Sequence, residues 1–130
     1  MRKPNGESRS VVKSGKNKPY IPERGDLVWV SFTPQAGHEQ SGRRQALVLT
    51  PGDYNVRSGL ALMCPITSRI KGYPFEVILP KGSEISGAIL TDQVKSLDWR
   101  KREAIFIDRV GKSLMTEVID LVMTLLHEED

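Results

Sequence analysis

The sequence predicts a mainly β fold, a small curled barrel of short strands followed by one C-terminal helix. Short apolar runs recur at close intervals, and Pro, Gly and Asp separate them, which is typical of strands joined by tight turns. The apolar residues change to helical spacing only near the C-terminus. The chain has 130 residues, which is enough for one domain with a modest core.

Residues 1–19 are predicted to form a disordered basic leader ahead of a domain that spans residues 20–130. After Met1, only Val11 and Val12 in this segment are apolar, too few to offset the entropy of ordering it. Residues 1–18 hold six basic residues and one acidic residue, whereas the rest of the chain holds thirteen basic and fifteen acidic residues. A nucleic-acid surface on the folded part therefore requires local clusters of cations.

Strands are predicted in the first half at residues 26–32, 45–50 and 60–66. The first is rich in Val, Trp and Phe, and the second ends at Pro51. Pro65 lies within the third, and because proline lacks the N–H that a ladder needs, it indicates an edge, a bulge or the end of a strand.

Further strands are predicted at residues 74–79, 87–94 and 104–110. The helix follows, with Ser113 as its N-cap, and should cover an open end or face of the sheet. Its apolar residues at helical spacing are Leu114, Val118, Leu121, Val122 and Leu125.

Composition excludes several classes of protein. No apolar run is long enough to span a bilayer, and no apolar stretch follows the early charges as in a signal peptide. A single cysteine, Cys64, cannot form an internal disulfide, and its apolar surroundings predict a small buried side chain, which fits a cytoplasmic protein. His38 and His127 lie too far from it in sequence for a metal motif, so neither a metal nor another cofactor is expected.

The polar loop before the second predicted strand is the first candidate site. It contains His38, Glu39, Arg43 and Arg44 within seven positions. Guanidinium groups match phosphate oxygens, while a carboxylate or imidazole can move protons, so the loop could bind a phosphodiester and break it. A merely solvated hairpin loop can have the same composition, so the loop alone does not decide the function.

Two clusters later in the sequence also combine polar and basic residues. Thr67 and Ser68 end the third predicted strand and are followed by Arg69 and Lys71. The other cluster contains Asp92, Gln93, Lys95, Trp99 and Arg100. Cations beside an aromatic ring suit single-stranded RNA, because guanidiniums hold phosphates while a ring stacks on a base. Each cluster also has an ordinary structural explanation, and both Trp29 and Trp99 fit a core position.

A wider pattern consists of seven segments that follow one another along the chain: residues 25–30, 37–44, 47–51, 54–55, 65–68, 71–77 and 92–97. In these segments the chain resembles the MazF/PemK (Kid) family of bacterial toxins, and it is similar to the MazF branch in residues 71–77 and 92–96. The resemblance covers the whole predicted domain. One departure is that the family usually has proline after the arginine that Arg44 matches, whereas this chain has Gln45.

The resemblance implies a homodimer of SH3-like barrels that acts as the toxin of a type II toxin–antitoxin system. Such a toxin is a metal-independent endoribonuclease, an mRNA interferase, that cuts single-stranded RNA at short motifs and stops translation and growth. The ribose 2′-hydroxyl attacks the adjacent phosphate and leaves a 2′,3′-cyclic phosphate and a 5′-hydroxyl. The implied partner is a cognate MazE-like antitoxin with an acidic disordered tail, and no membrane is involved.

Matched by position, Arg44 and Thr67 correspond to the family's critical arginine and threonine. Because arginine stays protonated, Arg44 is expected to clamp the developing negative charge. Glu39 matches a loop acid that some members use and His38 is implicated in the Kid-like branch, with their roles as base and acid left open. The RNA-binding residues are expected to be Arg43, Arg69, Lys71, Asp92, Gln93, Lys95 and Arg100.

Two other functions share this type of fold, and fold alone does not choose among them. A non-enzymatic RNA- or DNA-binding barrel would bind RNA in chelator without cutting it. A gyrase poison of the CcdB kind uses an aromatic-containing carboxyl end, whereas residues 126–130 here contain no Phe, Tyr or Trp.

Overall fold

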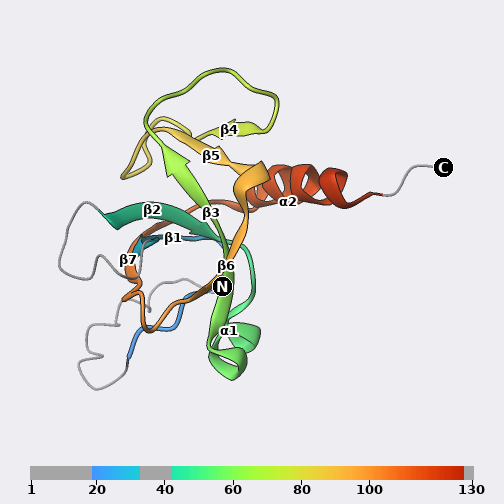
Figure 1. Cartoon of the computed structure of the whole chain (residues 1–130). Coiled ribbons are helices and arrows are strands. Elements are labelled where there is room, and N and C mark those ends of the chain that lie inside the picture. The colour runs from blue at the N-terminus through green and yellow to red at the C-terminus, as the bar shows by residue number, and fades with distance from the viewer. Residues whose placement is uncertain (1–18, 33–41, 128–130) are drawn as a thin grey trace.

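The computed structural model describes residues 19–32 and 42–127 (Figure 1). Within these residues the elements are β1 (Asp26–Ser31), β2 (Arg43–Val48), α1 (Gly52–Ser58), β3 (Leu60–Thr67), β4 (Glu76–Ile78), β5 (Ala88–Leu90), a 3-10 turn (Thr91–Gln93), β6 (Lys95–Asp98), β7 (Ile105–Arg109) and α2 (Lys112–Leu126). The mainly β fold with a C-terminal helix is therefore confirmed. The predicted leader, apart from Pro19, lies outside the described residues.

All strand pairs are antiparallel, and β3 is the strand about which the sheet curls. The order is β4-β5-β3-β2-β1-β7, and β6 also pairs with β3. Figure 1 shows β3 running from the β6 end of the molecule up to the β4–β5 hairpin. In the described part of the chain β4 and β7 remain the two ends of this order, so the sheet is barrel-like but open.

Pro65 lies within β3 and does not end it. On one side of β3 the pairs with β6 stop at Met63, and the pairs with β5 begin at Ile66. On the other side Pro65 faces Ala46 of β2. The proline thus occupies the position where β3 exchanges one neighbour for another, and the ladder there does not require its missing N–H. The sequence predicted an edge, a bulge or a strand end at Pro65, whereas in the structure β3 changes its neighbouring strand there from β6 to β5.

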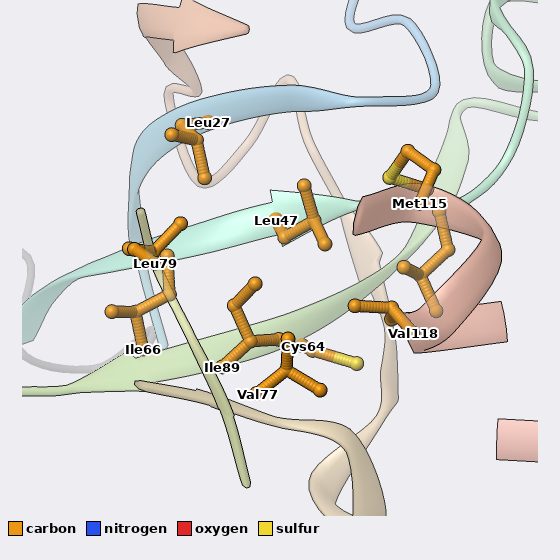
Figure 2. Close-up of a cluster of buried hydrophobic side chains, with 10 residues drawn as sticks. Leu27, Leu47, Cys64, Ile66, Val77, Leu79, Ile89, Met115 and Val118 are labelled. Atoms are coloured by element: carbon orange, nitrogen blue, oxygen red, sulfur yellow. The ribbon is translucent and has the colours of Figure 1, made fainter. Parts of the chain in front are cut away.

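Alternation along the strands produces two cores on opposite sides of the sheet. The helix-side core, most of which Figure 2 shows, consists of Leu27, Leu47, Leu49, Cys64, Ile66, Val77, Leu79, Ile89, Met115 and Val118. The tryptophan-side core consists of Val28, Val30, Ala46, Val48, Ala61, Met63, Leu97 and Trp99. Helix α2 covers the first core, as the sequence predicts, but through Met115, which the prediction omitted, and Val118; Leu114, Leu121 and Val122 pack beside them, and Leu125 is 47% exposed. The pKa of the Cys64 thiol is raised to about 12, mainly by burial and to a smaller extent by the negative charge of Asp92.

Helix α1 occupies a segment where the sequence indicated only a turn. Its buried Asn55 donates from Nδ2 to the carbonyl oxygens of Pro22 (2.8 Å) and Thr50 (2.9 Å). Trp99 donates from Nε1 to the Asn55 carbonyl (3.0 Å). Tertiary hydrogen bonds therefore stabilise a helix of seven residues that would be marginal alone.

The predicted strand at residues 87–94 was wrong in its second half. Only the strand β5 forms within that range; the 3-10 turn follows it, and the unpredicted strand β6 begins at Lys95, beyond the predicted strand. Thr91 is fully buried, and both its N–H (3.1 Å) and its hydroxyl (2.7 Å) donate to the Phe75 carbonyl oxygen. This anchor turns the chain away from β5, and β6 then pairs with the first half of β3.

Two smaller expectations also need correction. Gly111, not Ser113, is the N-cap of α2, because the helix begins at Lys112 directly after β7. Trp99 is in the core at 3% exposure, but Trp29 is 39% exposed, so only one of the two tryptophans has the predicted position. No helix among the described residues is long and apolar enough to cross a membrane.

Candidate active site

Thr67 is the last residue of β3, and its hydroxyl is held by the chain that follows. Its Oγ1 accepts the N–H of Arg69 at 3.0 Å. A hydroxyl has one proton and two acceptor positions, so this bond leaves the O–H of Thr67 able to donate. The arrangement suits a donor to a phosphate oxygen.

A solvent-open pocket of about 200 Å³ lies beside Thr67. Its lining residues are Thr67, Arg69, Lys71, Tyr73, Phe75, Glu76, Leu90, Asp92 and Gln93. The structure thus brings together five residues that the sequence nominated from two separate clusters. The other four supply two aromatic rings, an aliphatic wall and a carboxylate. Cationic, amide and aromatic groups around one small hollow can bind both a phosphate and a base.

Buried Thr91 joins the two sides of the pocket. Through the Phe75 carbonyl it ties the segment before β4 to the 3-10 turn that carries Asp92 and Gln93. The exposed side chains of that turn therefore stand on a fixed base.

Arg44 and Lys95 converge on the ring of Phe32. The Arg44 Cζ atom lies 5.6 Å and the Lys95 Nζ atom 5.7 Å from the ring centroid. Both distances are within the range of cation–π attraction. One aromatic ring thus holds two cations from strands that are not neighbours in sequence.

Arg44 and Thr67 are related by the register of β2 and β3. The last pair is Ala46 opposite Pro65, and two positions further along each strand lie Arg44 and Thr67. Side chains two positions apart share a face of a sheet, so the guanidinium and the hydroxyl lie on the side of the tryptophan-side core. At this point β3 leaves β2 and pairs with β5 (Figure 1).

Arg43 and Arg44 are the first two residues of β2, whereas the sequence placed both just before the strand. They pair with Ser31 and Val30 of β1. Gln45, which stands where the family usually has proline, pairs with Trp29 inside the same ladder. Strand pairing on the β1 side therefore holds the backbone at Arg44.

The remaining predicted site residues lie elsewhere. Arg100 stacks on Trp99, with its Cζ 4.8 Å from the ring centroid, and it is not among the residues that line the pocket. His38 and Glu39 lie outside the described residues. Among residues 19–32 and 42–127, no three His, Cys, Asp or Glu side chains are arranged to hold a metal ion.

The pocket residues that sequence reasoning missed are Tyr73, Phe75, Glu76 and Leu90, and Phe32 was missed beside Arg44. A signal existed for three of them, because Tyr73, Phe75 and Glu76 fall in the run 71–77 that carries the family resemblance. Nothing in the sequence marked Phe32 or Leu90 beyond their expected strands.

Residues 23–126 match the family described as PemK-like, MazF-like toxins of type II toxin–antitoxin systems. The chain belongs to this family. It is 53% identical over 85 residues to the endoribonuclease toxin MazF of Escherichia coli K12, a match that covers 65% of this chain and 76% of that protein. To the endoribonuclease PemK of Escherichia coli it is 36% identical over 110 residues, with 80% and 81% covered.

Solved structures agree with this membership. The crystal structure of MazF from Deinococcus radiodurans has a TM-score of 0.76 and 52% identity, with 83% of this chain and 98% of that chain covered. A MazE–MazF crystal structure from the same organism has a TM-score of 0.76 at 44% identity, with 85% and 100% covered.

The MazF-like chain is therefore a type II toxin of the endoribonuclease class. Its higher identity to MazF than to PemK confirms the predicted branch. The non-enzymatic barrel and the gyrase poison are not favoured.

Proposed function

We propose that this toxin is a metal-independent endoribonuclease that cuts single-stranded mRNA at short sequence motifs in the cytoplasm and thereby stops translation and growth. The observation that carries the proposal is the placement of Arg44 and Thr67. Each lies two positions beyond the last β2–β3 pair, Ala46 opposite Pro65, and on the same face of its strand as that pair, and Thr67 opens onto a pocket lined by further cations.

In the proposed reaction the ribose 2′-oxygen attacks the adjacent phosphorus and the bond to the 5′-oxygen breaks. The products are a 2′,3′-cyclic phosphate and a 5′-hydroxyl. Arg44 binds the phosphoryl oxygens as negative charge grows on them, and the Thr67 hydroxyl donates to the same group. His38 and Glu39 are the candidates for removing the proton of the 2′-hydroxyl and protonating the leaving oxygen.

The other predicted residues bind the strand on either side of the scissile phosphate. Arg43, Arg69, Lys71 and Lys95 attract phosphates, and Arg100 extends this attraction beyond the pocket. Asp92 and Gln93 offer acceptors and a donor to a base edge, while Tyr73 and Phe75 offer rings beside it.

The partner is proposed to be a MazE-like antitoxin whose acidic, disordered tail folds onto the cationic site of a toxin homodimer. The MazE–MazF complex of Deinococcus radiodurans supports this choice of partner. Because tail and RNA would meet the same cations, inhibition should compete with RNA. A titration of labelled RNA against the inhibited complex checks this, and occlusion is wrong if that complex binds RNA as tightly as free toxin.

The deciding experiment incubates the purified full chain with a short single-stranded RNA in EDTA. Cleavage that ends in a 2′,3′-cyclic phosphate supports the proposal, and sequencing of the 5′ ends gives the motif. Binding without cleavage, or cleavage only on addition of a divalent metal, contradicts it.

A further inference from the structure

We propose that Glu76 is a positioning residue of this active site. Its carboxylate holds the backbone of Lys71 and Gly72, and so fixes the segment that presents Arg69 and Lys71 at the rim of the pocket. The inference rests on the proposed function and adds to it a residue that does not itself need to touch RNA.

The contacts of the Glu76 carboxylate are with two successive backbone N–H groups. Its Oε1 accepts from Gly72 at 2.8 Å and from Lys71 at 3.1 Å, and its Oε2 accepts from Lys71 at 3.2 Å. Successive N–H groups that point to one spot form an anion-binding concavity. Hydrogen bonds to an ionised acceptor are also stronger than neutral ones. Here the protein's own carboxylate occupies the concavity.

The held segment leads from β3 to Phe75, whose carbonyl is tied to Thr91. Residues 68–75 belong to no helix or strand. At one end Thr67 Oγ1 binds the Arg69 N–H, and at the other Glu76 binds Lys71 and Gly72. Two side chains thus fix the path of the backbone from which both cations project. Loss of either would loosen the backbone that carries those cations.

Glu76 is itself well anchored. It is the first residue of β4, where it pairs with Leu90, and its N–H donates to the Tyr73 carbonyl at 3.0 Å. The next residue, Val77, is buried in the helix-side core. The carboxylate therefore transmits the rigidity of the sheet to the loop.

The backbone conformation of Gly72 is also part of the concavity that holds the Glu76 carboxylate. Its φ of +83° lies in the left-handed region that L side chains rarely adopt, and a Cβ there would meet nothing within 4 Å. The glycine is therefore needed for backbone conformation and not for space. This gives a second variant, Gly72→Ala, that disturbs the same concavity without touching a charge.

The test compares Glu76→Ala with Glu76→Gln. Glutamine keeps one carbonyl oxygen able to accept from both N–H groups but removes the charge, whereas alanine removes every contact. Positioning predicts that the glutamine variant retains most of the kcat/KM of wild type. It predicts that the alanine variant loses roughly tenfold to a hundredfold, mainly through KM, with an unchanged pH profile. Gly72→Ala should show the same loss of kcat/KM, and it keeps the inference testable if Glu76→Ala fails to fold.

Asp108→Ala is the matched control. Asp108 lies in β7 and makes the same kind of contact with a different loop, because its Oδ2 accepts the Glu84 N–H at 3.1 Å. It should leave kcat and KM at wild-type values, so a comparable loss there would mean that any loosened loop lowers activity. Circular dichroism and thermal unfolding check the fold of each variant.

A second measurement separates this inference from the proposed function. A short single strand in which every ribose lacks the 2′-hydroxyl cannot be cut by this reaction, and its binding is measured by fluorescence anisotropy. Glu76→Ala should weaken this binding, and should weaken it less once Lys71→Ala is present, since neighbouring effects are not additive. If wild type binds but never cuts, the proposed function fails while the role of Glu76 is still measured.

Two outcomes overturn the inference. Glu76→Ala and Gly72→Ala variants that bind and cut as wild type would show that the segment does not need the carboxylate. A Glu76→Gln variant that loses kcat as severely as alanine and also loses one limb of the pH profile would show that the charge takes part in proton transfer.

Discussion

Arg44 and the segment after Thr67 are held in opposite ways, although both serve the same proposed site. Arg44 is part of β2, and its backbone is fixed by pairing with Val30 of β1. Arg69 and Lys71 stand on irregular backbone that is fixed by two side chains, Thr67 and Glu76. A ladder tolerates changes of side chain because backbone groups make its bonds. The loop does not, because its support comes from side chains. We therefore expect the residue whose position matters most for cleavage to be the strand residue Arg44.

The largest expected effect is at the strand-held position. Arg44→Ala should lower the cleavage rate by about a hundredfold to a thousandfold, the typical cost of one preorganised donor at a developing charge. Arg44→Lys should recover little, because an ammonium lacks the planar fork of a guanidinium. Initial rates on a short RNA in EDTA measure both.

Arg43→Ala is the matched control for Arg44. Arg43 is the neighbouring residue in the same strand, where it faces Ser31, and we assign it to general phosphate attraction. Its loss should be milder and should diminish as salt rises. A folded Arg44→Ala protein that cuts within a few-fold of wild type would contradict the assignment of Arg44.

Thr67 is expected to have the second largest effect, because it belongs to both regions. Thr67→Val keeps the shape but removes the hydroxyl, and with it both the donor to the phosphate and the acceptor for the Arg69 N–H. We expect about a hundredfold loss of kcat/KM, seen in kcat and KM together. Thr67→Ser should restore most of it. If valine raises only KM, the hydroxyl serves the loop and not the phosphate.

The sequence predicted the strand-held part of this site better than the loop that is held by side chains. Arg44 and Thr67 were matched through the family resemblance, and the apolar strands beside them gave each a place in the predicted fold. The strand ends themselves were displaced, since Arg43 and Arg44 pair with β1 residues that no local pattern reveals. Strands β1 to β5 and β7 and helix α2 follow apolar runs that local sequence can detect.

The features that sequence reasoning missed all depend on tertiary contacts. Helix α1 requires the hydrogen bonds of Asn55 with Pro22 and Thr50. Strand β6 requires Thr91 to redirect the chain onto β3. Glu76 stands between the apolar Phe75 and Val77 in the sequence, as a solvent-facing strand residue does, and its contacts with the Lys71 and Gly72 backbone form only when the loop is folded.

Substitution of Phe32, whose ring contacts the strand-held Arg44, should have a smaller effect than substitution of Arg44 or Thr67. Its ring holds Arg44 and Lys95 at 5.6 and 5.7 Å, and an exposed cation–π contact contributes about 0.5–1 kcal/mol. Phe32→Leu keeps apolar bulk and every charge, so kcat/KM should fall several-fold while the salt dependence of RNA binding stays that of wild type. Tyr54→Leu, at an exposed aromatic of α1, is the control. A loss as large as that of Arg44→Ala would mean that the ring contacts RNA directly.

The smallest effect is expected outside both regions, at residues 1–19. This segment lies outside the matched residues 23–126, and Tyr20 and Ile21 already pack on the tryptophan-side core. Deleting residues 1–19 should therefore leave folding, dimerisation and cleavage at moderate salt unchanged. It should lower RNA affinity only at low salt and make the dependence of log affinity on log salt shallower, since six basic residues and one acidic residue no longer displace counterions. Binding measured across a salt series, with size-exclusion chromatography for the dimer, tests this. A truncated chain that fails to fold, or that loses cleavage at moderate salt, would show that the leader is part of the toxin domain.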